Sequence, residues 1–125
     1  MPYDLRQWPA SVYPGEVDVF PEAKVDIDVV LQQLRTQGPS PLGYNVKNLG
    51  KSKGYLWQLN IKVQRKQIRI LYSPYRQVIV LFRIHKKGSP QEQQRAYVEA
   101  MTRKRAAENA MQQAGYTHVG LATVH

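Results

Sequence analysis

The sequence predicts an α+β protein, in which a small antiparallel β-sheet, a meander of three to four strands, is packed on one face by an N-terminal and a C-terminal helix. Three observations lead to this fold class: helical spacing of apolar residues over 21–37, three strand-like segments between residues 55 and 84, and a helix-start motif at Ser89. The chain has 125 residues, of which 42% are hydrophobic, so it is long enough for one domain with a substantial core.

The first twenty residues show no clear period. They contain three of the chain's eight prolines, namely Pro2, Pro9 and Pro14. We therefore expect residues 1–20 to form an irregular arm and residues 21–115 to form the body of the domain. Residues 116–125 are expected to form a C-terminal tail, which either adds a short edge strand or frays.

A helix is predicted over residues 21–37, where apolar side chains recur at helical spacing. These are Ala23, Ile27, Val30, Leu31 and Leu34. Asp26 and Asp28 lie early in the segment, where the helix dipole favours acidic groups, and Arg35 lies in the last turn. Gly38 then ends the helix, because glycine readily adopts the conformation that follows a helix C-terminus.

The connection over residues 38–54 is rich in Gly, Pro, Ser and Asn and contains Lys47, Lys51 and Lys53. Backbone amides and ammonium groups of such a loop can follow a phosphate chain. A solvated loop without a ligand is the alternative for each single lysine.

Three strands are predicted next, over residues 55–63, 68–73 and 78–84, with polar turns at 64–67 and 74–77. The first two strands alternate apolar and polar side chains, which indicates one covered face and one polar face. The third strand is apolar on both faces, so it is expected at the centre of the sheet. The short turns favour hairpin connections.

The last helix begins at Ser89, where Ser89, Pro90 and Glu92 form a capping box with proline at the first helical position. Helical spacing then continues to Gly115. The apolar residues on this spacing are Tyr97, Ala100, Met101, Ala107, Met111 and Ala114.

Several chemistries are excluded by composition and spacing. The chain has no Cys, so it has neither disulfides nor thiolate metal ligands, and its three histidines, His85, His118 and His125, lack the spacing of a zinc site. The glycines form neither a dinucleotide-binding nor a Walker loop, so we expect no metal and no cofactor. We see no signal peptide and no apolar run of membrane-spanning length, and we expect a cytoplasmic protein that does not enter a membrane.

The distribution of charge is uneven within a net charge of +9. No acidic residue lies between residues 29 and 91. The same stretch contains the following cations: Arg35, Lys47, Lys51, Lys53, Lys62, Arg65, Lys66, Arg69, Arg76, Arg83, Lys86 and Lys87. This pattern favours a nucleic acid or an acidic protein as partner, the alternative being a basic surface that serves solubility.

Strand alternation predicts that the cations and amides of the three strands share one face of the sheet, with the helices on the other face. The predicted set is Gln58, Asn60, Lys62, Arg69, Arg83 and His85. Lys86 and Lys87 would border this face. Each member also has a plainer interpretation: Arg69 could cover an apolar shelf, His85 could end a strand, and the two lysines could protect a sheet edge from aggregation.

These segments together resemble a known family. The runs VKNLGKSKGYLWQLNI, IRILY, HKKGSP and AYVEAMTRKRAAE, in this order and spacing, resemble the phage-derived Gp49-like (HigB-type) toxins of the RelE/ParE superfamily. The similarity covers roughly residues 24–108. It implies a RelE-like fold and a toxin of a toxin–antitoxin system. Where the family reads Glu-Leu-Arg, this chain has Gln58, Leu59 and Asn60, so both charges are replaced.

The resemblance implies a ribosome-dependent, metal-independent mRNA endoribonuclease, whose partners are mRNA on the ribosome and a cognate antitoxin, expected to be a helix-turn-helix protein. The chemistry needs a base for the 2′-OH, cations for the phosphate and an acid for the departing oxygen. Arg69 and Arg83 are expected to clamp phosphate, and proton transfer is expected of one of four residues. These are Lys53, His85, Lys86 and Lys87.

RNA contacts are expected from Lys47, Lys51 and Lys62, with Tyr55 or Tyr72 stacking on a base. Two alternatives stay open. One is a non-catalytic relative that binds RNA or protein, and the other is a ParE-like inhibitor of DNA gyrase.

Overall fold

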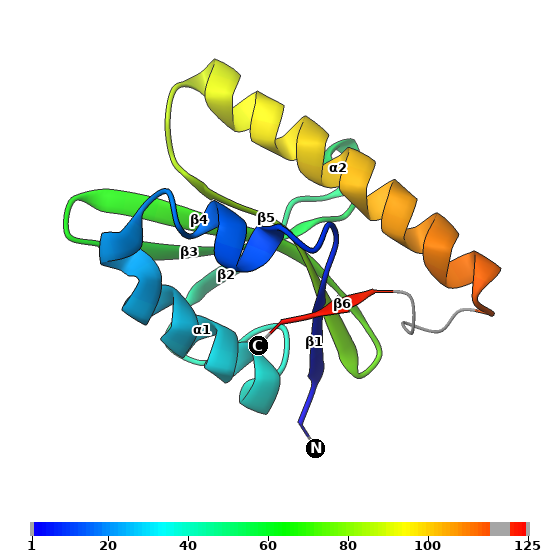
Figure 1. Cartoon of the computed structure of the whole chain (residues 1–125). Coiled ribbons are helices and arrows are strands. Elements are labelled where there is room, and N and C mark those ends of the chain that lie inside the picture. Colours follow the sequence, from blue (N-terminus) through cyan, green and yellow to red (C-terminus); the bar gives the residue numbers. More distant parts are fainter. Residues whose placement is uncertain (1, 116–120, 125) are drawn as a thin grey trace.

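The computed structural model describes residues 2–115 and 121–124, and it contains one mixed β-sheet of six strands with a helix on each side. The strand order is β2-β3-β4-β5-β1-β6 (Figure 1). The strands are β1 (Asp4–Gln7), β2 (Asn45–Asn48), β3 (Trp57–Val63), β4 (Lys66–Tyr75), β5 (Val78–Lys86) and β6 (Ala122–Thr123). The helices are α1 (Lys24–Gln37) and α2 (Pro90–Gln113), with short helical segments η1 (Val12–Glu16), η2 (Pro21–Ala23) and η3 (Lys51–Lys53).

The α+β class is confirmed, and the three predicted strands are present as the antiparallel meander β3-β4-β5. The predicted caps are present as well. Ser89 Oγ accepts a hydrogen bond from the Glu92 amide at 3.2 Å, with Pro90 at the first position of α2. Gly38 follows α1 with a φ of 95°, a value at which a side chain would be strained.

The prediction of a three- to four-strand meander is wrong, because β1 and β2 form in segments that were expected to be an irregular arm and a loop. The C-terminal tail adds β6 at the edge of the sheet, which was one of its two expected outcomes. β1 lies inside the segment expected to be an irregular arm, and it pairs in parallel with β5, with Asp4 opposite Val78. β6 pairs antiparallel with β1, with Arg6 opposite Thr123. β5 therefore lies inside the sheet, as its apolar character predicted. The edge of β5 that does not pair with β4 forms its backbone hydrogen bonds with β1. Val119, part of the expected edge strand, lies outside the described residues.

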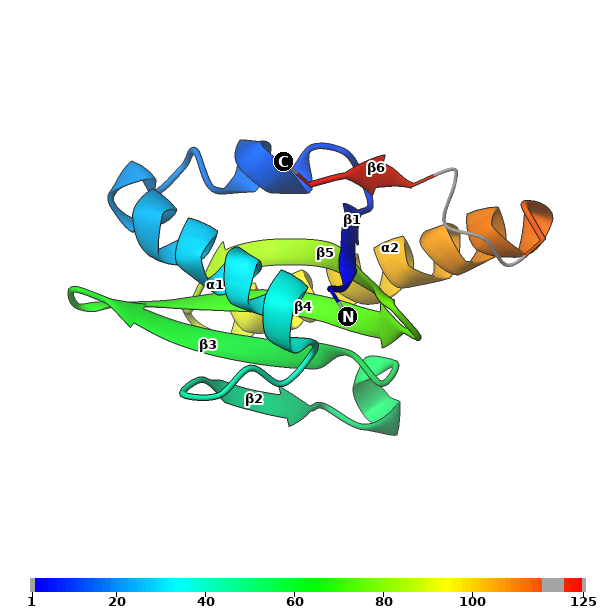
Figure 2. The ribbon, with the colours of Figure 1, turned by 90° about the horizontal axis from the view of Figure 1, so that it is seen from below.

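The prediction that both helices cover one face is also wrong, since α1 and α2 lie on opposite sides of the sheet (Figure 2). α1 packs its buried residues Ile27, Leu31 and Leu34 into a cluster with Ile70 of β4. α2 packs into a second cluster. This cluster contains Leu56, Leu71, Val80, Phe82, Ala100, Ala107, Met111 and Leu121.

A β-bulge in β5 changes which side chains point to which face of the sheet. The register changes from Leu71 opposite Arg83 to Tyr72 opposite Leu81, which leaves Phe82 as the extra residue. Ile79, Leu81 and Ile84 consequently belong to the α1 cluster, while Val80 and Phe82 belong to the α2 cluster. Strict alternation would have placed Phe82 and Ile84 on one face, so the sequence pattern alone did not predict that these two side chains separate.

Within the described residues, neither helix combines the length and the apolar character that crossing a membrane requires.

Candidate functional site

Three predicted site residues lie together where β4 and β5 pair. Arg69 is directly opposite His85, and Arg83 is opposite Leu71, two residues along the same strand pair. Because residues that face each other across an antiparallel pair point to the same side, Arg69, Arg83 and His85 share the α2 face. Asn60 of β3 is opposite Arg69 and lies on this face as well. The sharing of one face is the arrangement that strand alternation predicted.

The first half of α2 covers this face, which was expected to be open. Tyr97 of α2 accepts a hydrogen bond from Arg69 Nη1 at 3.1 Å and donates one to Gln58 Oε1 at 2.8 Å. Arg69 also donates to the side chain of Gln93. Gln93 in turn donates to the carbonyl of Gly88 at 2.9 Å. A network of neutral groups therefore orients the Arg69 guanidinium, and no carboxylate takes part in it.

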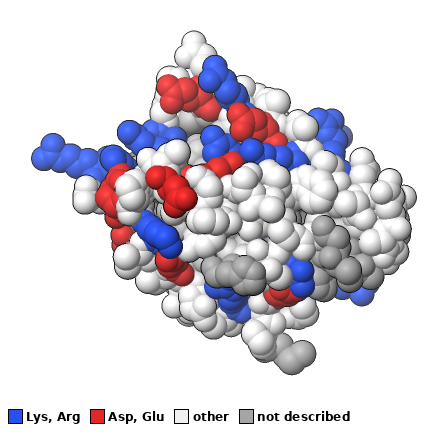
Figure 3. Space-filling model, viewed as in Figure 1, with Lys and Arg blue, Asp and Glu red and all other residues white. Residues whose placement is uncertain are grey.

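Arg83 is ion-paired, contrary to the expectation that no carboxylate would compensate these cations. Its Nη1 lies 3.1 Å from Glu16 of η1, and its Nε lies 3.3 Å from Glu99 of α2. Arg103 of α2 joins the same two acids, at 2.7 Å from Glu16 and 3.9 Å from Glu99. The acids come from segments outside the acid-free stretch. Figure 3 accordingly shows acidic and basic atoms side by side in the upper part of the molecule, where α2 runs in Figure 1.

His85 is the most buried titratable group of the site, with only 6% of its surface exposed. Burial, together with the smaller effect of the nearby charges of Arg83 and Arg69, lowers its pKa to about 4. The imidazole is therefore neutral at pH 7. Its Nδ1 lies 3.3 Å from the Lys86 carbonyl, which favours the tautomer with the proton on Nδ1. Its Nε2 then carries a lone pair.

Unpaired polar atoms concentrate around this histidine. His85 Nε2, Arg69 Nε and Asn60 Oδ1 are all buried without a hydrogen-bond partner, and all three belong to the α2 face. Such atoms are uncommon in folded proteins and cost free energy. The ring of Tyr97 stands edge-on to His85 with centroids 6.4 Å apart. This part of the α2 face therefore buries an unpaired acceptor, His85 Nε2, and an unpaired guanidinium donor, Arg69 Nε.

A cavity of about 320 Å³ opens beside His85 between the end of β5 and the first half of α2. The residues that line it are Arg83, His85, Lys86, Glu92, Arg95, Ala96 and Glu99. Lys86 and Lys87 are exposed at this end of β5. Lys53 of η3 places its ammonium group 5.4 Å from the centre of the Tyr97 ring, so it borders the same network from the loop side.

The other predicted RNA-binding residues separate into two groups. Lys47, Lys51 and Lys62 are exposed, and Lys47 is opposite Gln58, on the α2 side of the sheet. Tyr55 is 56% exposed and is free to contact a ligand. Tyr72 is completely buried in the α1 cluster, and its hydroxyl donates to the Pro39 carbonyl. Stacking of Tyr72 on a base was a wrong expectation, because the ring lies in the core on the opposite face of the sheet.

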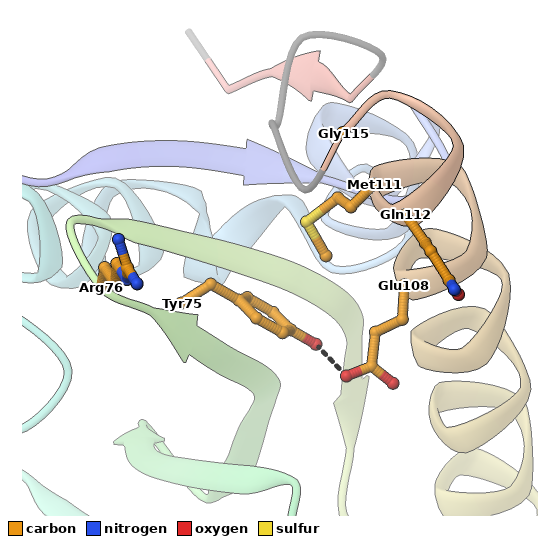
Figure 4. Close-up of a pocket in the computed structure, with 6 residues that line it drawn as sticks. All are labelled: Tyr75, Arg76, Glu108, Met111, Gln112 and Gly115. Carbon is orange, nitrogen blue, oxygen red and sulfur yellow. Dashed lines mark hydrogen bonds between the residues drawn. The ribbon is translucent and has the colours of Figure 1, made fainter.

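A larger hollow of about 650 Å³ lies at the other end of α2, next to the β4–β5 turn (Figure 4). Its walls include Tyr75 and Met111, and Arg76 stands at its edge. Tyr75 donates a hydrogen bond to Glu108 at 3.3 Å, and burial raises the pKa of its hydroxyl. None of the predicted site residues lines this hollow.

Sequence reasoning missed the partners that orient the cations. Tyr97 and Gln93 are one helical turn apart on α2, and Tyr97 was assigned to the apolar core by its spacing. A signal was available, because a tyrosine on a helix that packs over arginines can accept their hydrogen bonds. Glu16 offered no signal, since the segment around it has no period.

In comparisons with known proteins, no family model, no curated protein and no solved structure matches this chain. Among residues 2–115 and 121–124, no group of three or more His, Cys, Asp or Glu side chains could hold a metal ion. Among the described residues, the site thus combines a guanidinium whose hydrogen-bond partners are neutral, that of Arg69, with a buried imidazole nitrogen that has no hydrogen-bond partner, His85 Nε2.

Proposed function

We propose that this protein is a toxin of the RelE/ParE type that cleaves mRNA on the ribosome without a metal ion, using His85 as the base. One observation carries the proposal: a neutral histidine with an unpaired Nε2 lies opposite Arg69 on adjacent strands, beside a polar cavity. The resemblance of residues 24–108 to Gp49-like toxins supports the same conclusion.

The proposed reaction uses residues that already lie together. The phosphate to be cleaved binds to Arg69, whose guanidinium is oriented by neutral partners and has no carboxylate to displace. His85 Nε2 takes the proton of the adjacent 2′-OH, and the 2′-oxygen attacks phosphorus. The bond from phosphorus to the 5′-oxygen breaks, and Lys53, whose ammonium group lies over the Tyr97 ring that contacts Arg69, donates a proton to that oxygen. Lys86 does not serve here, because it is opposite Ile68 of the α1 cluster and so points to the other face of the sheet. The products are a 2′,3′-cyclic phosphate and a 5′-hydroxyl.

The pKa of His85 has to rise for this residue to act as an efficient base at neutral pH. A pKa of about 4 makes a weak base at neutral pH, because proton transfer is most efficient when the pKa lies near the working pH. A bound phosphate would offset the charges of Arg69 and Arg83, which contribute to the low value. RNA binding is therefore expected to raise the pKa of His85 by the part that these two charges cause, while burial, the largest cause, still keeps it below 6.5.

The exposed cations of the loop and of β3 supply the remaining contacts. Lys47, Lys51 and Lys62 are available for phosphates on either side of the cleaved bond, and Tyr55 is available for stacking on a base. A cognate antitoxin would neutralise the toxin by covering this basic surface with acidic groups. The partners proposed are thus mRNA on the ribosome and an antitoxin.

A second candidate is an RNA- or protein-binding relative without cleavage. The observation that favours it is the pairing of Arg83 with Glu16 and Glu99, which neutralises one of the two expected phosphate clamps.

Mapping of mRNA cleavage on translating ribosomes tests the first proposal against the second. Wild-type protein is expected to cut, His85→Gln to cut at least about 100-fold more slowly, and Arg69→Ala to lose most of the activity. Arg76→Ala is the matched control, because Arg76 is an exposed cation at the opposite end of β4 and should leave cleavage unchanged.

Full cleavage by His85→Gln would overturn the assignment of the base. RNA binding by wild-type protein without any cut would support the non-catalytic relative. Growth arrest with gyrase-linked DNA damage and intact mRNA would support a gyrase inhibitor instead.

A further inference from the structure

The carboxylate of Glu16 occupies a site built from other parts of the fold. Its Oε1 accepts a hydrogen bond from the backbone amide of Ile84 at 2.8 Å and lies 3.1 Å from Arg83 Nη1. Its Oε2 accepts a hydrogen bond from Arg103 Nη1 at 2.7 Å. One backbone amide and two guanidinium groups, from β5 and α2, therefore converge on a single carboxylate. The Glu16 side chain is only 13% exposed.

This donor set also suits a phosphate group. Guanidinium groups and backbone amides bind carboxylate and phosphate oxygens in the same way, through short charge-assisted hydrogen bonds. A phosphodiester carries one negative charge, as Glu16 does, so exchanging one for the other leaves the charge of the site unchanged. Glu99 would stay beside Arg83 and Arg103 in both states.

The donors and their occupant belong to separate elements. Arg83 and Ile84 are held in β5, and Arg103 also donates to the Phe82 carbonyl at 2.7 Å, so this arginine keeps a partner when Glu16 leaves. The segment around Glu16 is anchored by Val12 and Val17, which are fully buried. Rotation of the Glu16 side chain is therefore sufficient to empty the site, and the segment itself stays in place.

We propose that Arg83, Arg103 and the Ile84 amide form a second phosphate site, which Glu16 occupies as an internal competitor until RNA displaces it. Arg83 also lines the cavity beside His85, so the two phosphate sites are adjacent. The identity of the ligand as an RNA phosphodiester rests on the proposed function. The anion site itself is testable without cleavage.

The experiment compares Glu16→Ala with Glu99→Ala, which removes an acid of the same ion-pair network and changes the net charge equally. Binding is measured with a 2′-O-methyl RNA oligonucleotide, which cannot be cleaved by 2′-OH attack, and separately with inorganic phosphate. Glu16→Ala is expected to bind the oligonucleotide on the order of 10-fold more tightly than wild type, because one opened charged hydrogen-bond site is worth about that factor. Glu99→Ala is expected to gain only about twofold through general electrostatics.

Additional variants and measurements distinguish a change in RNA binding from a folding defect and identify the anion that binds. Glu16→Gln keeps the shape of the side chain and should also gain affinity, while adding Arg103→Ala to Glu16→Ala should abolish the gain. In wild-type protein, the amide resonance of Ile84 should shift when the oligonucleotide is added. Stronger binding of inorganic phosphate than of the oligonucleotide would overturn the assignment of a phosphodiester ligand.

Equal gains in Glu16→Ala and Glu99→Ala, or none in the folded Glu16→Gln, would show that Glu16 is a structural clamp and would overturn the proposal. Its failure is distinct from failure of the proposed function. If Glu16→Ala binds RNA more tightly but the wild type does not cleave mRNA, the proposed phosphate site is supported and the proposed ribonuclease activity is contradicted. If the wild type cleaves mRNA but Glu16→Ala shows no gain in RNA affinity, only the proposed role of Glu16 as an internal competitor is contradicted.

Discussion

The two faces of the sheet are built differently, although both are covered by a helix. The α1 face is filled by aliphatic side chains, such as Leu31 and Leu34 against Ile70. The α2 face changes character along the helix: its second half packs Met111 in an apolar cluster, whereas its first half places Tyr97 over Arg69 and His85.

The difference separates stability from reactivity. On the α1 face, the hydroxyl of the fully buried Tyr72 is satisfied by the Pro39 carbonyl. The first half of the α2 face instead buries charged and polar atoms, of which His85 Nε2 and Arg69 Nε have no partner. A protein tolerates such atoms most readily where they serve a ligand. The comparison predicts that mutations on the α1 face act on folding and that mutations at the start of α2 act on both folding and binding.

The largest effect is expected from a cavity on the α1 face. Leu31→Ala should lower the free energy of unfolding by about 2–5 kcal/mol, because the side chain is buried in the cluster between α1 and the sheet. Urea unfolding measures this change. Leu42→Ala is the matched control, since Leu42 is 86% exposed, and it should change stability by less than about 0.5 kcal/mol. Similar losses in both variants would contradict the assignment of the core.

The next effect is a dependence of stability on pH that comes from the α2 face. The folded pKa of His85 is about 4, against 6.5 for the unfolded residue, so only the unfolded chain takes up a proton between these values. The contribution of the neutral His85 to the free energy of unfolding is therefore fully present above pH 6.5. It falls by up to about 3 kcal/mol as the pH drops toward 4.

Unfolding curves of wild type and His85→Gln between pH 7 and 4 isolate this contribution, since the variant should lack it. The His85 ring resonances should titrate with a midpoint near pH 4. A titration midpoint near pH 6.5 would mean that His85 is more exposed to solvent than the structure indicates.

The smallest effect concerns the hydroxyl that joins the two sides of the network. Tyr97→Phe removes the hydrogen bonds to Gln58 and Arg69 and should cost about 1–2 kcal/mol, because Gln58 Oε1 is left buried and unpaired. Tyr55→Phe is the control, since the exposed Tyr55 should be insensitive. Thermal unfolding at pH 7 compares the two. A neutral Tyr97→Phe would mean that α2 is held over this face by its apolar half alone.

Local pattern predicted more of the fold than of the site. The capping box at Ser89, the end of α1 at Gly38 and the central position of β5 follow from interactions within a few residues or from side chains apolar on both faces. The shared face of Arg69 and Arg83 also follows from alternation. β1 could not be predicted, because only Leu5 is a buried apolar residue in it and its pairing depends on the open edge of β5.

By itself, the sequence determined the strands β3, β4 and β5, the start of α2 at Ser89, the end of α1 at Gly38 and the uneven charge, since each depends on neighbours along the chain. Only the tertiary structure decided that α2 covers the polar face and that a carboxylate reaches Arg83. Glu16 lies 68 residues from the Ile84 amide that it binds in β5. The bulge at Phe82 determines which side chains of β5 lie on the same face of the sheet as Arg83. Contacts at this separation depend on the packing free energy of whole elements, which a local pattern does not contain.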